Sequence, residues 1–176
     1  MIMKSLIEKI QKHYNYIKLL RKRGCKIGED CEIYSSANFG SEPYLISLGD
    51  HVRVNAGVNF VTHDGGVWVI RKYSGTTVRE KERIDLFGKI TVGSNVHIGT
   101  NAMIMPGVEI GDNCIIGCGA IVTKNIPENS IAVGIPARVI ETIDEYVRKH
   151  MNDFDYTKDL SIGEKKEYLL RKYFER

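Results

Sequence analysis

The chain has 176 residues, of which 43% are hydrophobic, and a formal net charge of +3. This length suits one domain with short appendages, and the mild charge includes no basic run of the kind that binds nucleic acid. No stretch of about 18 apolar residues indicates a membrane span, and the N-terminal residues lack the apolar core of a signal peptide, so we expect a cytoplasmic protein.

The first predicted element is a helix over residues 4–23, within an N-terminal segment of residues 1–24. Ser5 and Glu8 have the spacing of a capping box, and Gly24 is a typical end residue. We expect this helix to cap one end of the domain that follows. The alternative is a helix that binds a partner protein.

Aliphatic residues then recur at every sixth position, first from Ile27 and later from Val92. The second series runs without a miss through Val92, Ile98, Ile104, Ile110, Ile116 and Val122. A period of six fits neither an α-helix nor a simple strand, but it is typical of a parallel β-helix built from hexapeptides. The sequence therefore predicts an all-β solenoid over residues 25–140, with about 18 residues per coil and about five coils.

The first series changes phase within residues 35–47. Its inward positions are predicted at Ile27, Ile33, Phe39 and Leu45, and after a slip of three residues at Leu48, Val54 and Phe60. A bulge or small loop is expected at the slip.

The four cysteines do not look like a disulfide framework. We expect Cys25, Cys31 and Cys114 to be small core residues and Cys118 to face outward. The absence of a CxxC pair disfavours a zinc or redox motif.

Residues 63–88 interrupt the repeat with a segment rich in charges and aromatic residues. Long excursions from a regular fold are usually functional. Because Trp68, Val69 and Ile70 are too apolar to leave in water, we expect a folded, protruding loop rather than a disordered insertion.

After Ile126 the repeat ends, and the chain is expected to double back along the solenoid. Residues 141–176 form the C-terminal segment, with a helix predicted over 141–153. Ser161 and Glu164 have the spacing of a second capping box, which predicts a final helix over residues 162–175.

Residues 92–140 resemble the C-terminal half of the hexapeptide-repeat acyltransferases. The likeness covers about residues 25–140, and within the family it is similar to galactoside, maltose and polysaccharide O-acetyltransferases. It implies a left-handed β-helix, an exception to the usual right-handed crossover. It also implies a homotrimer that binds acetyl-CoA as co-substrate in the cleft between neighbouring prisms.

The resemblance also implies functional residues. The family's catalytic histidine precedes the extended loop, at the place of His63 in this chain. By position, the contacts to CoA fall on Thr100, Cys118, Thr123, Lys124 and Arg138. The chain departs from the family at His97, where many sugar acetyltransferases have Trp, and at Glu141, where a second basic residue is common. The sugar-binding Asn has its nearest counterpart in Asn38 or Ser35.

Histidine suits a general base, because its ordinary pKa of about 6.5 lets it accept and return a proton near neutrality. We expect direct attack by the acceptor in a ternary complex, without a covalent enzyme intermediate. Glu42 lies about one coil before His63 and is the first candidate to orient the imidazole, with Asp64 and Asp85 behind it. The alternative for Glu42 is a solvated carboxylate at a corner.

Trp68 is either an acceptor-binding residue that stacks on a sugar ring or part of a small core within the loop. Five basic residues of the loop form either a contact surface for an anionic acceptor or a solvated charged face. They are Arg71, Lys72, Arg79, Lys81 and Arg83.

The favoured function is O-acetylation of a saccharide without a metal. N-acetylation of an amino sugar and acetylation of an antibiotic remain alternatives within the family. A zinc enzyme of the carbonic anhydrase type, using His51, His63 and His97, and a non-enzymatic scaffold are more remote.

Overall fold

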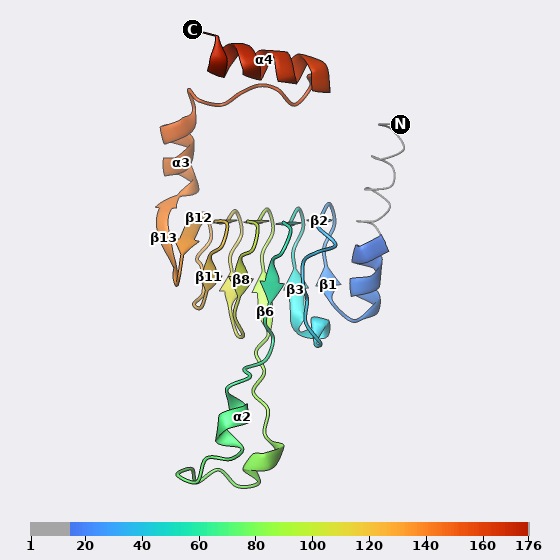
Figure 1. The fold of residues 1–176 in the computed structure, drawn as a ribbon, viewed down its shortest axis with the longest axis vertical. Helices are drawn as coiled ribbons and strands as arrows, with labels where there is room; N and C mark the ends of the chain where they lie inside the picture. The colour runs from blue at the N-terminus through green and yellow to red at the C-terminus, as the bar shows by residue number, and fades with distance from the viewer. Residues whose placement is uncertain (1–14, 176) are drawn as a thin grey trace. The chain divides into compact units, whose positions relative to one another are not determined.

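The computed structural model describes residues 15–175, and its main body is a three-sided parallel β-helix (Figure 1). The chain visits three faces in turn. Face A contains β1 (Lys26–Ile27), β3 (Ile46–Leu48), β6 (Ile90–Val92) and β9 (Glu109–Ile110). Face B contains β2 (Glu32–Ile33), β4 (Arg53–Val54), β7 (His97–Ile98), β10 (Ile115–Ile116), β12 (Ser130–Gly134) and β13 (Ala137–Thr142). Face C contains β5 (Asn59–Phe60), β8 (Met103–Ile104) and β11 (Ile121–Val122), and isolated bridges add Asn38 to face C and Ile126 to face A.

Equivalent hexapeptide positions stack in register from coil to coil. On face C, Phe60 pairs with Ile104 and Ile104 pairs with Val122, all in the parallel sense. The pairs are one coil apart, because each aliphatic position of the repeat returns to the same face after three hexapeptides. The period of six in the sequence therefore predicted the strand positions correctly.

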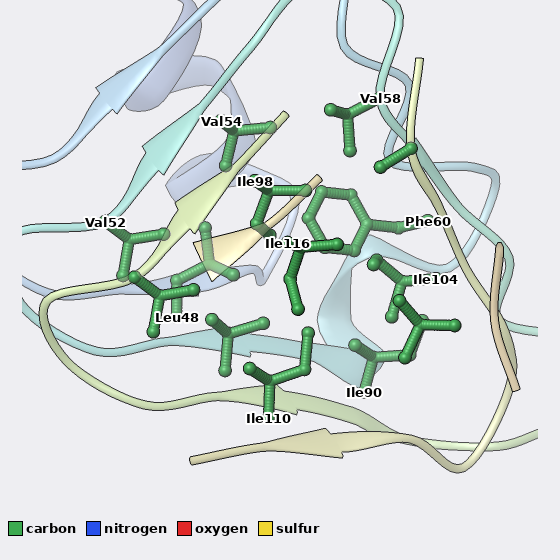
Figure 2. Packing of buried hydrophobic residues seen from close by; sticks show 14 of the residues in the cluster. Leu48, Val52, Val54, Val58, Phe60, Ile90, Ile98, Ile104, Ile110 and Ile116 are labelled. Atoms are coloured by element: carbon green, nitrogen blue, oxygen red, sulfur yellow. The ribbon is translucent and has the colours of Figure 1, made fainter. Parts of the chain in front are cut away.

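The aliphatic positions of all three faces point toward a common axis, where they form the core (Figure 2). Ile98, Ile104 and Ile116 have no exposed side-chain surface. Full burial of such a side chain contributes about 1.5–3 kcal/mol.

The four cysteines are free thiols. Cys25 and Cys114 are buried as predicted, Cys31 is half-buried and Cys118 is exposed. Burial raises the pKa of the Cys25 thiol to about 12.

The corner between faces A and B relies on residues that tolerate left-handed backbone. Asn95, Asn113 and Asn129 all have φ between 54° and 57°. Their side chains form a ladder, in which Asn95 Nδ2 donates to Asn113 Oδ1 (2.8 Å) and Asn113 Nδ2 donates to Asn129 Oδ1 (2.9 Å). Asparagine suits this position because its short amide accommodates positive φ and bonds locally. His51 takes the same backbone conformation in the coil with β4.

The phase slip corresponds to a single 3-10 turn, η1 (Pro43–Leu45). The prediction of Leu45 as an inward residue was wrong. Leu45 is half-buried in the turn, and Ile46 and Leu48 of β3 fill the core instead. The turn adds residues at the corner between faces C and A, so the next strand begins later than a strict repeat requires.

The loop of residues 63–88 leaves the prism between β5 and β6 (Figure 1). It contains a short helix, α2 (Val67–Ile70), and the 3-10 turn η2 (Lys81–Arg83). At its neck, His63 and Phe87 form an antiparallel bridge, and Gly88 N–H donates to the Thr62 carbonyl (2.9 Å). The loop is folded, but the expectation that its apolar residues are buried was wrong. Trp68 is 75% exposed, because a helix of four residues presents no core against which the indole can pack.

The two ends of the chain are attached differently. Residues 15–22 are helical and pack Leu20 into the core, while the rest of the predicted helix, with Ser5 and Glu8, lies outside the described residues. At the other end, β12 and β13 form an antiparallel hairpin on face B. The helix predicted from residue 141 begins two residues later, because β13 continues to Thr142.

The chain divides into two compact units, and the boundary lies between Asp144 and Glu145. Helix α3 (Ile143–His150) crosses this boundary, and α4 (Ile162–Phe174) begins with the predicted capping box of Ser161 and Glu164. Within the second unit, Asp155 accepts hydrogen bonds from Tyr168 and Lys172, each at 2.6 Å. None of the helices within residues 15–175 has the length and apolar character needed to cross a membrane.

Candidate active site around His63

His63 lies at the corner between faces C and A, where the loop begins. Its Nδ1 is 3.0 Å from Oε2 of Glu42, which comes from the same corner one coil earlier. The His63 side chain is 48% exposed, whereas the Glu42 side chain is only 15% exposed. The ring of Phe87, on the returning strand of the loop neck, meets the imidazole edge-on with centroids 6.2 Å apart. The structure therefore brings together the two residues that were predicted one coil apart.

Hydrogen bonds to the Glu42 carboxyl keep it ionised. They lower its pKa from the ordinary value, with the Thr62 hydroxyl as the largest cause, followed by Ser41 and His63. An anionic carboxylate only accepts hydrogen bonds, so the proton of a neutral His63 lies on Nδ1. Nε2 is then left with a lone pair that can accept a proton from a substrate.

A pocket of about 230 Å³ opens beside His63 on the side of the loop. Its polar lining includes Asp64, Arg71 and Asp85, and Trp68 and Leu86 contribute apolar surface. Asp64 Oδ1 accepts the Gly66 N–H at 2.7 Å, and Asp85 pairs with Arg71. Of the three candidate carboxylates, Glu42 is the one that lies within hydrogen-bond distance of the imidazole.

The basic residues of the loop largely satisfy groups of the loop itself. Arg71 also donates to the Ile84 carbonyl, Lys81 Nζ donates to the Tyr73 carbonyl (2.6 Å), and Arg83 pairs with Glu80 (3.0 Å). Contact of the five basic residues with an anionic acceptor stays a prediction, and Arg71 is the one of the five that lines the pocket beside His63.

The residues expected to contact CoA occupy different edges of the prism. Thr123 and Lys124 are exposed at the corner between faces C and A, which is also the edge of His63. Thr100 and Cys118 stack at the corner between faces B and C, where the Gly119 N–H donates to the Thr100 carbonyl (2.8 Å). Within one chain, four of the five residues expected to contact CoA are therefore divided between the two edges of face C. The fifth, Arg138, lies on β13 of face B.

The two residues expected to bind the acceptor are not brought together. Asn38 lies on the outer side of face C, where its Nδ2 donates to Asn59 Oδ1 (3.2 Å) and its Oδ1 accepts the Gly40 N–H (3.0 Å). Trp68 lines the pocket beside His63, and Asn38 does not. Of the two, only Trp68 therefore lies beside His63 within this chain.

The three histidines considered for zinc occupy separate places. His51 lies at the corner between faces A and B, with Nδ1 2.7 Å from Asp30 Oδ2. His97 lies on the outer side of face B, where burial and the nearby Arg53 lower its pKa. Within residues 15–175, no three His, Cys, Asp or Glu side chains converge as a metal site requires.

Sequence reasoning missed Thr62, whose hydroxyl donates to Glu42 Oε2 at 2.8 Å. The residue follows Phe60 in the repeat and has the size of an ordinary core filler at a corner. Only its position directly before His63 sets it apart in the sequence.

Comparison with known proteins gives consistent results over most of the chain. Residues 89–124 match the family described as bacterial transferase hexapeptide (six repeats). Protein CapG of Staphylococcus aureus is 46% identical over 175 residues, which cover 98% of each chain. Galactoside O-acetyltransferase of Escherichia coli strain K12 is 51% identical over 73 residues, or 42% of this chain and 36% of that relative. A solved galactoside acetyltransferase in complex with coenzyme A is similar with a TM-score of 0.55 and 25% identity, covering 86% of this chain and 88% of the other.

Proposed function

The chain belongs to the hexapeptide-repeat acyltransferase family, and we propose that it transfers an acetyl group from acetyl-CoA to a hydroxyl of a saccharide. The observation that carries the proposal is the pairing of His63 Nδ1 with Glu42 at the mouth of a pocket. In the neutral imidazole, this arrangement places the proton on Nδ1 and leaves the lone pair of Nε2 for a substrate. It supports general base catalysis, which typically contributes 10²–10⁴-fold to a rate.

In the proposed reaction, Nε2 of His63 takes the proton of the acceptor hydroxyl as the hydroxyl oxygen attacks the thioester carbonyl. The negative charge of Glu42 stabilises the imidazolium that results. Backbone N–H groups at the coil edge of a neighbouring chain are the proposed donors to the oxyanion. Collapse of the tetrahedral adduct breaks the carbon–sulfur bond, and His63 returns the proton to the departing CoA thiolate. No group of the protein is acylated.

A homotrimer accounts for the division of the proposed CoA contacts between two edges. Thr123 and Lys124 share the edge of His63, whereas Thr100 and Cys118 line the other edge of face C. A cleft between two prisms would place one edge from each chain around a single ligand. Lys124 and Arg138 would supply cations to the CoA phosphates, where charge-assisted hydrogen bonds are strongest. The coenzyme A in the similar galactoside acetyltransferase supports this choice of co-substrate.

The finer details of the fold follow the same family. The likeness to hexapeptide-repeat acetyltransferases supports the left-handed sense of the prism, and the pairing of β2, β4, β7, β10 and β12 is in keeping with about five coils. We place the reaction in the cytoplasm, because acetyl-CoA is produced there.

The pocket beside His63 is the proposed acceptor site. Its volume of about 230 Å³ is below the range typical of drug-sized ligands, which suits a single sugar unit. The exposed indole of Trp68 offers a surface for the apolar face of the ring, and Asp64 offers a carboxylate oxygen to its hydroxyls.

The proposal is tested with His63→Asn, followed by release of free thiol from acetyl-CoA in a screen of saccharide acceptors. We expect a loss of turnover of about 10²–10⁴-fold, while calorimetry shows unchanged binding of CoA. His51→Asn is the matched control, because His51 also pairs with a carboxylate and Asn occupies the equivalent corner in three other coils. A His63 variant that turns over like the wild type, or a protein that shows no heat with CoA, would contradict the proposal.

A further inference from the structure

Thr62 is one of three buried polar residues within the described part of the chain, together with Ser130 and Thr157. It is only 1% exposed. Burying a hydroxyl without a hydrogen-bond partner is costly, so the partner of the Thr62 hydroxyl indicates what the residue does. That bond goes to Oε2 of Glu42 at 2.8 Å.

The same carboxylate oxygen receives both hydrogen bonds. Oε2 of Glu42 accepts from Thr62 Oγ1 on one side and is 3.0 Å from His63 Nδ1 on the other. Thr62 and His63 are adjacent in the chain, so the two bonds fix the carboxylate against a single short segment. A glutamate side chain has three rotatable bonds, and two bonds to one oxygen leave it little freedom.

The backbone of Thr62 is bonded to the returning strand of the loop. Its carbonyl accepts the Gly88 N–H at 2.9 Å, which closes the neck of the loop. Threonine is branched at Cβ and therefore stiff about χ1. The hydroxyl is thus presented from a rigid point where the prism and the loop meet.

We propose that Thr62 is a positioning residue, whose hydroxyl fixes the Glu42 carboxylate in the place where that carboxylate orients His63. The inference rests on the proposed role of His63 as general base. Thr62 acts only through Glu42 and touches neither substrate. Its removal leaves the carboxylate free to rotate away from Nδ1, so the imidazole loses its orientation while the site for CoA is unaltered.

Thr62→Val removes the hydroxyl and keeps the shape of the side chain. We expect kcat for thiol release to fall about 10- to 100-fold, with KM for acetyl-CoA within twofold of the wild type. Thr62→Ser retains the donor and should recover most of the activity. Thr157→Val makes the same change at another buried threonine, in the C-terminal unit, and should leave both constants unchanged. Methyl β-galactoside serves as the probe acceptor, and hydrolysis of acetyl-CoA by water is followed in parallel.

A double-mutant cycle separates positioning from a general structural effect. If Thr62 acts through Glu42, the variant with both Thr62→Val and Glu42→Gln is no slower than Glu42→Gln alone. Losses that multiply would overturn the inference, as would a Thr62→Val enzyme with full kcat. Thr62→Ala takes the place of the valine variant in the cycle if circular dichroism shows that the latter does not fold.

The outcome for His63 is read separately. Full turnover in His63→Asn would refute the proposed function. A large loss in His63→Asn, combined with losses at Thr62 and Glu42 that multiply in the double variant, would refute only the positioning role. In either case, the ¹³C carboxyl resonance of Glu42, followed against pH, reports the pKa of this carboxyl. The pKa should rise in Thr62→Val, because the Thr62 hydrogen bond is the largest cause that lowers it.

Discussion

Adjacent isoleucines on β10 provide a sharp test of the inward register. Ile116 has no exposed surface and points to the axis (Figure 2). Its neighbour Ile115 is half-exposed on the outer side of face B. Ile116→Ala removes three carbon atoms from the core, which at about 0.8 kcal/mol each amounts to about 2.4 kcal/mol. A residual cavity adds to this loss, because stacked coils cannot collapse into it, and the expected total is about 3–4 kcal/mol.

Urea denaturation followed by circular dichroism measures the free energy of unfolding of both variants. Ile115→Ala makes the same chemical change on the same strand and should cost less than about 1 kcal/mol. The comparison is made at two protein concentrations, because assembly of subunits would make stability depend on concentration. Equal losses at the two positions, or a greater loss at Ile115, would refute the assignment of the inward face.

Two further predictions concern pH and the corners of the prism. Because the pKa of Glu42 is lowered in the folded protein, its contribution to stability is present above the ordinary value of 4.5 and is lost as the pH falls through the folded pKa. Urea midpoints of the wild type and Glu42→Gln should therefore converge below pH 4.5 and keep a constant difference above it. At the edge expected to meet CoA, an added Cβ would lie 2.6 Å from the Cys118 backbone nitrogen at Gly99, whereas at Gly119, with φ +68°, it meets no atom within 4 Å. Gly99→Ala should cost about 3 kcal/mol and Gly119→Ala about 1–2 kcal/mol, and the opposite order in thermal unfolding would contradict the coil stacking.

Periodic features of the molecule were predictable because the repeat imposes them. Ile98, Ile104 and Ile110 each occupy an inward position as a direct consequence of their spacing. The pairing of Glu42 with His63 was predictable for the same reason, since stacked coils bring residues of one corner together once the phase slip is counted. The slip itself was located correctly, but its inward residue was not, because the 3-10 turn displaces Leu45 from the axis.

Non-periodic features escaped prediction because no rule of spacing governs them. The apolar character of Trp68 suggested burial, but the loop extends from the prism and gives the indole nothing to pack against. The partners of Arg71 and Lys81 depend on how that loop folds back on itself. Thr62 looked like core filler, since nothing in its residue type indicates that its hydroxyl points to a carboxylate from the previous coil.

A second histidine–carboxylate pair in the prism shows how the surroundings of His63 differ from those of an ordinary corner. His51 also lies 21 residues after a carboxylate, and its Nδ1 is 2.7 Å from Asp30. There the side chains of His51 and Asp30 are 67% and 82% exposed, against 48% and 15% for His63 and Glu42. Exposed charges interact weakly in water, so the pair at His51 does not hold its ring firmly. A repeating prism thus produces histidine–carboxylate pairs by stacking alone. At the corner where the chain leaves the repeat, the carboxylate is largely buried and residues of the loop form a pocket beside the ring, and these two features distinguish His63 as the proposed general base.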